Sequence, residues 1–232
     1  MLLLGSFDVY ITKILINSFN QLLLLYIQGT IITVELLSQP VRAPTISPVL
    51  SALRTSTKEK HRILDASMPL ANPEADWFDY IDHLNILATW LIPLEHWLAK
   101  HCDGPQGEQA PAFIRYSDLI ALDLAQADAL PANRCFDIAS WPKQENSAYR
   151  WGISYVIEGS QLGGEFLYKR LSARLAPRKL GYLQGKQSGR WPAFLQALAT
   201  YVVTPMDIDS ACAGAVDAFD ALLKQLPVRE QL

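Results

Sequence analysis

Residues 149–171 read YRWGISYVIEGSQLGGEFLYKRL, and the fold of the chain depends on what packs against this stretch. Its apolar pattern predicts one long helix, yet four glycines interrupt it, and each costs a helix about 1 kcal/mol relative to alanine. Gly152, Gly159 and Gly163 share one helix face, and Gly164 lies beside that face. A helix face without side chains admits either another backbone or a flat ligand. Close packing of two helices and a kinked helix lying over a flat ligand therefore both remain open.

A second stretch, residues 47–66, reads SPVLSALRTSTKEKHRILDA and predicts another helix. Ser47 is a suitable N-cap, and Pro48 suits the first helical position. His61 falls on the apolar stripe of this helix, and Asp65 comes one turn later, within reach of a ring nitrogen. A carboxylate in that position commonly orients an imidazole that binds a metal, although a lone histidine is more often a core residue. The stripe consists of Leu50, Leu53, Thr57, His61 and Leu64.

The run YVIEGSQLGG, residues 155–164, resembles the distal-helix motif of heme oxygenases, particularly the bacterial biliverdin-forming type associated with bacteriophytochromes. The stretch around His61 resembles the proximal helix of the same family, in which a basic residue and a threonine precede a histidine and an acidic residue. The resemblance runs from about Pro48 to Leu226. It implies an all-α, single-domain helical bundle of the heme oxygenase type.

Carried onto this sequence, the resemblance makes His61 the axial iron ligand and Asp65 the partner of its other ring nitrogen. Arg54 and Lys58 stand where the family has cations that bind the heme propionates. Cations at the rim would fix the rotation of the heme in its plane, because its edge carries two carboxylates. That rotation decides which meso carbon is attacked.

The resemblance also implies that the distal helix both binds heme and carries catalytic positions. Gly159 and Gly163 would lie over the heme and leave room for O2, with Ser160 and Gly164 completing the catalytic set. Many heme oxygenases have an acidic residue directly after the first distal glycine, where it organises the water that delivers protons. This chain has Ser160 there, so Ser160 and a chain of ordered waters are the candidates for that task.

The rest of the chain after residue 46 predicts further helices and no credible strand pair. Residues 77–99 have a helical apolar period that Pro93 should kink or divide. Residues 115–130, 191–201 and 207–226 predict three more amphipathic helices. Helices joined by short loops indicate a single bundle-like core.

Residues 1–46 differ in composition from the rest of the chain. Residues 14–37 are strongly apolar, but polar side chains interrupt them well before the roughly 20 residues that a membrane span requires. We therefore expect residues 1–46 to be an extension and linker outside the core, and residues 47–232 to form the helical domain. A peripheral membrane anchor is the alternative. The interrupting residues are Asn17, Asn20, Gln21, Gln28 and Glu35.

The composition of the chain argues against some classes of protein. The chain has 232 residues, of which 50% are hydrophobic, and this is ample for a core. A net charge of −3 without a basic run argues against nucleic-acid binding. Three widely spaced cysteines fit a reducing cytoplasm better than a disulfide framework.

The resemblance implies a reaction in which heme is both cofactor and substrate, and O2 opens it to biliverdin, CO and ferrous iron. Electrons would come from a donor of the ferredoxin, flavodoxin or reductase type, and a bacteriophytochrome could receive the biliverdin. Two alternatives remain: a heme-binding carrier without turnover, and another enzyme on the same helical scaffold. A di-iron oxidase is poorly supported, because no histidine has Glu-x-x-His spacing.

Overall fold

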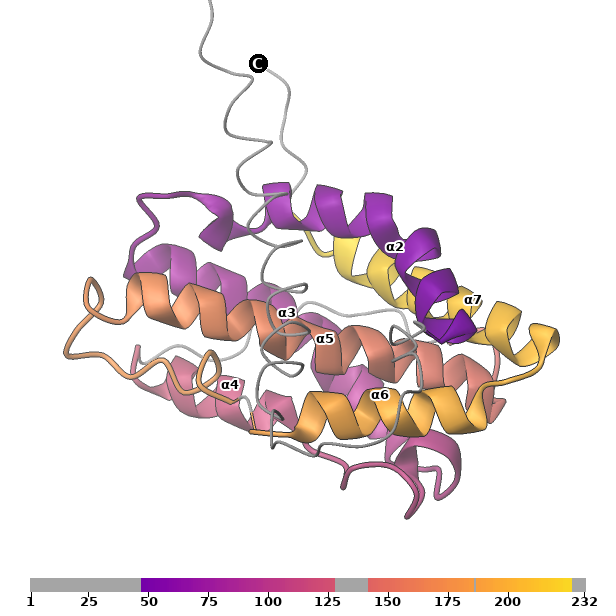
Figure 1. Ribbon diagram of the computed structural model, residues 1–232. Coiled ribbons are helices and arrows are strands. Elements are labelled where there is room, and N and C mark those ends of the chain that lie inside the picture. The colour runs from indigo at the N-terminus through magenta and orange to yellow at the C-terminus, as the bar shows by residue number, and fades with distance from the viewer. Residues whose placement is uncertain (1–46, 128–141, 186, 227–232) are drawn as a thin grey trace, which may run out of the picture. The chain divides into compact units, whose positions relative to one another are not determined.

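The computed structural model describes residues 47–127, 142–185 and 187–226, and the predicted extension at 1–46 lies outside them. The described residues form six α-helices and two short 3-10 turns, without a strand, and this confirms the all-α prediction. No helix among them is both long enough and apolar enough to cross a membrane. The helices are α2 (Pro48–Ser67), α3 (Trp77–Leu98), α4 (Tyr116–Ala125), α5 (Ser147–Leu171), α6 (Arg190–Tyr201) and α7 (Pro205–Leu223); the turns are η1 (Pro69–Ala71) and η2 (Gly104–Gln106) (Figure 1).

Several helices begin where the sequence carries a cap. Ser47 occupies the N-cap position of α2 in extended conformation, but its side chain makes no cap hydrogen bond; proline follows at the first helical position as predicted. Asp76 and Asp79 form a capping box at the start of α3, where Asp76 accepts from the backbone nitrogen of Phe78 at 2.8 Å. The Asn146 side chain accepts from the backbone nitrogen of Tyr149 at 2.8 Å and starts α5.

Pro93 does not divide α3, which runs through it from Trp77 to Leu98. An interior proline removes one hydrogen bond and crowds the preceding turn. The residues around it nevertheless belong to the core, since Trp90, Leu91 and Leu94 are almost fully buried. Their packing outweighs the local preference, because tertiary context commonly overrides helix propensity.

Two buried carboxylates fix the segments around α4. Glu95 of α3 accepts from the backbone nitrogen of Tyr116 at 2.8 Å and so holds the start of α4. Asp123 of α4 accepts from the Tyr80 hydroxyl at 2.6 Å and from the backbone nitrogens of Gly181 at 3.0 Å and Tyr182 at 2.8 Å. These bonds anchor part of the segment between α5 and α6.

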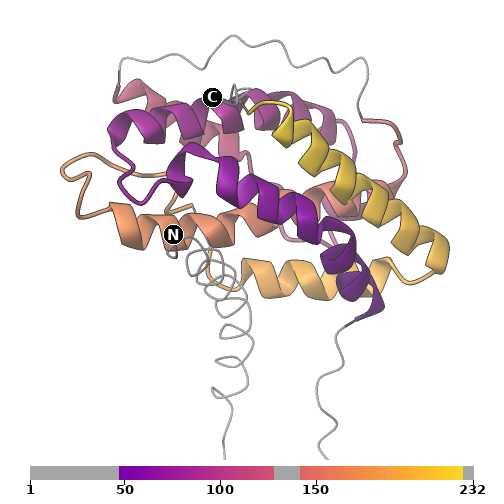
Figure 2. The ribbon, with the colours of Figure 1, turned by 90° about the horizontal axis from the view of Figure 1, so that it is seen from above.

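Helix α7 packs against both α2 and α5 and lies alongside α2 in both views (Figures 1 and 2). Its crossing with α5 depends on two glycines. A Cβ on Gly152 would lie 1.8 Å from the carbonyl oxygen of Ala211, and one on Gly214 would lie 2.1 Å from that of Tyr149. The two backbones are therefore in contact, and only glycine permits such an approach.

We expect Gly152→Ala to destabilise the protein, because the added methyl group would meet the α7 backbone rather than a side chain that can turn away. Overpacking of this kind costs about 1–3 kcal/mol, and a clash with backbone belongs at the upper end of that range or above it. Chemical denaturation of the apoprotein measures the loss. A variant as stable as the wild type would show that the crossing tolerates a side chain.

Candidate functional site

Helices α2 and α5 run in the same direction and are tied together at two levels. Near the start, Arg54 of α2 hydrogen bonds with the hydroxyl of Tyr155 on α5. Further along, Arg170 of α5 donates to the carbonyl oxygen of Leu70, just after α2. The predicted site residues of both helices lie between these ties, and α7 packs against both helices.

His61 lies about two turns beyond Arg54, and its side chain is 51% exposed. Its Nδ1 lies 2.8 Å from Oδ2 of Asp65, as the one-turn spacing predicted. This hydrogen bond raises the pKa of His61, while burial acts in the opposite direction. The ring packs against Phe219 of α7 with 5.8 Å between the centroids. Among the described residues the ring has no other hydrogen bond, so Nε2 is available to a ligand.

The predicted propionate cations differ in their surroundings. Lys58 is exposed, as a side chain that meets an anionic ligand at a rim should be. Arg54 is half-buried and bound to the Tyr155 hydroxyl, so it connects the two helices as well as carrying charge. Lys60, although close to Lys58 in the sequence, pairs instead with Asp220 of α7.

The glycine face of α5 has two parts. At Gly152 it is covered by α7, so close packing of helices explains that glycine. At Gly163 it is open, because a Cβ there would meet nothing within 4 Å. Gly163 lies about two turns beyond Tyr155, just as His61 lies about two turns beyond Arg54. The two residues are therefore at a similar distance along their helices from the Arg54–Tyr155 contact. Close packing of helices therefore accounts for Gly152, whereas the open face at Gly163 is compatible with a flat ligand.

The other predicted distal residues lie around this opening. A Cβ on Gly159 would meet the ring of Trp191 at 3.7 Å. Gly164 is buried, and its missing side chain would point towards the backbone of Leu183 at 3.5 Å, away from the open part of the face. Ser160 donates through Oγ to the carbonyl oxygen of Ile157 at 2.7 Å.

Ser160 also belongs to a polar cluster. Its Oγ accepts from Gln161 Nε2 at 3.3 Å, and Gln161 donates to the Tyr182 hydroxyl at 3.2 Å. Burial raises the pKa of Tyr182 to about 12, so this phenol stays protonated near neutral pH. The serine therefore joins the distal helix to a buried chain of hydroxyl and amide groups.

Sequence reasoning missed one apolar side chain on the open face of α5. Phe166 lies three residues after Gly163 on that face and is 38% exposed. The spacing of Phe166 from Gly163 could have identified it. A partly exposed aromatic ring at this position offers apolar contact to a ligand that lies on this face of α5.

These features fit one class of ligand. A flat macrocycle with a metal centre needs an imidazole with a free nitrogen, a bare helix surface and apolar walls, and its carboxylates need cations. The residues that supply this set are His61, Gly163, Phe166 and Lys58. The family model described as heme oxygenase matches residues 47–226. The chain belongs to the heme oxygenase family.

The fold agrees with this assignment. Crystal structures of the NO- and CO-bound heme oxygenase from Neisseria meningitidis align with a TM-score of 0.64 and 20% sequence identity. The alignment covers 80% of this chain and 96% of that one. At this identity the likeness establishes the heme oxygenase fold. No match was found among curated protein sequences.

Proposed function

We propose that this heme oxygenase binds heme between α2 and α5, where His61 would hold the iron, and uses O2 and external electrons to open it to biliverdin, CO and ferrous iron. The observation that supports the proposal most strongly is the half-exposed His61, whose Nδ1 is held by Asp65 at the level where the α5 face is open at Gly163. A histidine held in this way presents Nε2, the nitrogen that a metal would take.

Each group of residues then has a separate task. His61 would bind the iron, and Asp65, whose Oδ2 lies 2.8 Å from Nδ1, would keep the ring oriented. Lys58 and Arg54 attract the propionates and so limit rotation of the heme in its plane. Heme supplies the redox chemistry when bound, and the protein supplies position and exclusion of water.

On the distal side, Gly163 leaves room for a diatomic ligand, and Phe166 keeps the surroundings apolar. Ser160 holds the end of the hydrogen-bond chain through Gln161 to Tyr182. We assign proton supply to this side of α5, with Ser160 orienting water in place of the acid that many family members have. Buried water with several polar partners is suited to that task.

The motif YVIEGSQLGG supports a finer assignment to the bacteriophytochrome-associated type. In that case biliverdin passes to a bacteriophytochrome, and a ferredoxin, flavodoxin or reductase supplies the electrons. A cytoplasmic location would go with these partners. Within this proposal, residues 47–232 form the heme-binding domain and residues 1–46 are an extension.

A hemin titration and subsequent reduction in air test the proposal. We expect a Soret band of a histidine-ligated heme, and then, on addition of a reductant, its loss and a bilin absorption. Stoichiometric hemin binding without a bilin would instead identify a heme carrier. Absence of a specific Soret complex would contradict the proposal altogether.

Asp65→Ala should weaken heme binding without abolishing it, because His61 remains but its ring is no longer oriented. Loss of such a supporting carboxylate typically costs about 10- to 100-fold in affinity. Hemin titration of the variant measures this, with Asp82→Ala as the control, since Asp82 is an exposed carboxylate on α3. Equal affinities for both variants would show that Asp65 does not support the ligand.

A further inference from the structure

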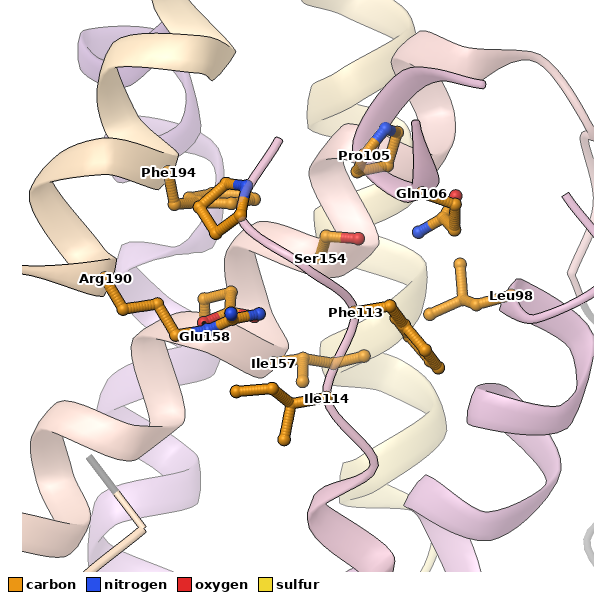
Figure 3. Close-up of a pocket in the computed structure, with 11 residues that line it drawn as sticks. Leu98, Pro105, Gln106, Phe113, Ile114, Ser154, Ile157, Glu158, Arg190 and Phe194 are labelled. Carbon is orange, nitrogen blue, oxygen red and sulfur yellow. Dashed lines mark hydrogen bonds and ion pairs between the residues drawn. The ribbon is translucent and has the colours of Figure 1, made fainter. Parts of the chain in front are cut away.

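The first two residues of α6 contact α5 from different sides. Arg190 donates to Glu158 through Nε at 2.8 Å and through Nη2 at 2.6 Å. The exposed fractions of the two side chains are only 9% and 10%. Tyr116 adds a hydrogen bond to Glu158 at 3.0 Å. Figure 3 shows Glu158 and Arg190 together at the edge of a small pocket, with Ser154 and Ile157 of α5.

This pocket lies away from the glycine face. Ser154, Ile157 and Glu158 are on the side of α5 opposite to Gly159 and Gly163, given about 100° of rotation per residue. The buried ion pair is therefore behind the distal helix rather than in front of the open face. Its bidentate geometry fixes the start of α6 firmly against α5.

Trp191, the next residue, reaches the glycine side. Its Cη2 and Cζ3 lie 3.7 and 3.9 Å from the position that a Cβ on Gly159 would take. The ring is stacked on Phe194, with 5.8 Å between centroids and 13° between planes, and it is tilted against Tyr155 at 5.6 Å. The indole therefore covers the face at Gly159, while the face at Gly163 stays open.

We propose that Trp191 is a specificity-determining residue, which closes the Gly159 end of the glycine face and confines the space for a diatomic ligand to the Gly163 end. The Glu158–Arg190 pair is the positioning element that holds the indole there. The inference rests on the proposed function, since it concerns heme bound at this face. The four meso carbons of heme lie at different places around its plane, so a wall on one side leaves some of them more accessible than others.

Two properties favour this role over simple filling of the core. Trp191 is only partly buried, whereas its aromatic neighbours Phe194 and Tyr155 are buried. Its outermost ring atoms also end at a glycine, where a longer or shorter side chain would change the open space directly. A ring that served only packing would not need to end there.

The test compares Trp191→Ala and Trp191→Phe with the wild type. Each protein is first titrated with hemin, then the rebinding of CO to its ferrous complex is measured after flash photolysis, and finally the bilin isomers are separated. We expect all three to bind hemin, with CO association several-fold faster in Trp191→Ala and a single bilin isomer replaced by a mixture. Trp191→Phe keeps an aromatic ring in the stack but shortens it, so it should fall between the two.

Trp97→Phe is the matched control, because Trp97 is another partly buried tryptophan in an aromatic contact, 4.9 Å from His101. It should keep the wild-type CO rate and isomer. Normal hemin binding with wild-type CO rates and a wild-type isomer in both Trp191 variants would overturn the inference and leave the proposed function standing. A wild-type chain that does not bind hemin would overturn both.

The positioning role needs a variant that leaves no buried charge unpaired, since a lone one is strongly destabilising. Glu158→Met combined with Arg190→Met removes both charges at once. If the pair holds Trp191, this double variant should shift CO association in the same direction as Trp191→Ala and also broaden the isomer distribution. A folded double variant with wild-type CO kinetics would remove the ion pair from the proposal.

Discussion

His61→Ala should abolish normal ring opening and remove the Soret band of the histidine-ligated complex. The reason is the absence of a replacement on α2: the chain has four histidines, and the other three lie in α3 or just after it. His83 is buried and His96 lies on the exposed side of α3. Without the imidazole, heme would be held only by its propionates and by apolar contact.

Hemin titration and a bilin assay measure this effect, and repeating the titration with added imidazole gives a second test. A cavity left by the missing side chain should admit free imidazole, which would restore part of the spectrum. His96→Ala is the control, because it removes an exposed imidazole and should behave as the wild type. A His61→Ala protein with wild-type spectrum and rate would show that the proximal assignment is wrong.

Gly163→Leu should leave a folded apoprotein that binds hemin but binds CO poorly and no longer opens the ring. A side chain at this position enters open space, since even a Cβ would meet nothing within 4 Å. Replacing glycine in a helix also removes an unfavourable propensity of up to about 1 kcal/mol. The apoprotein should therefore melt at or slightly above the wild-type temperature.

The matched controls come from the same helix. Gly163→Ala should melt like Gly163→Leu but keep most CO binding, because one methyl group fills little of the space. Gly152→Ala should melt far lower, because its methyl group meets α7. A large loss of apoprotein stability in Gly163→Leu, with normal CO binding by the folded fraction, would refute the distal assignment.

The sequence predicted local features well. Ser47 and Pro48 placed the start of α2, and the one-turn spacing of His61 and Asp65 placed their side chains 2.8 Å apart. Both results come from rules that act within a few residues of the chain. Pro93 shows where such a rule fails, because the buried residues around it hold α3 together.

The neighbour of each residue across the fold could not be assigned from the sequence. The spacing put Gly152 and Gly163 on one face, but it could not say that α7 covers only the first of them. Trp191 contacts α5 at Gly159, and Asp123 accepts a hydrogen bond from the segment that follows α5. Both contacts join residues that are far apart in the sequence, so no local pattern predicts them. Residues 1–46 lie outside the described residues, and their separation from the core stays a prediction.

The position of α7 has a consequence for biosynthesis. It packs on both α2 and α5, yet the ribosome makes it after both of them. A nascent chain that lacks α7 already contains His61 and Gly163, but the helix that braces their two supports has not been made. Apolar surface on α2 and α5 that α7 later covers stays open to solvent or chaperones during that interval. Heme loading is therefore expected after translation, because a cofactor met earlier would find α2 and α5 without the helix that packs against both of them.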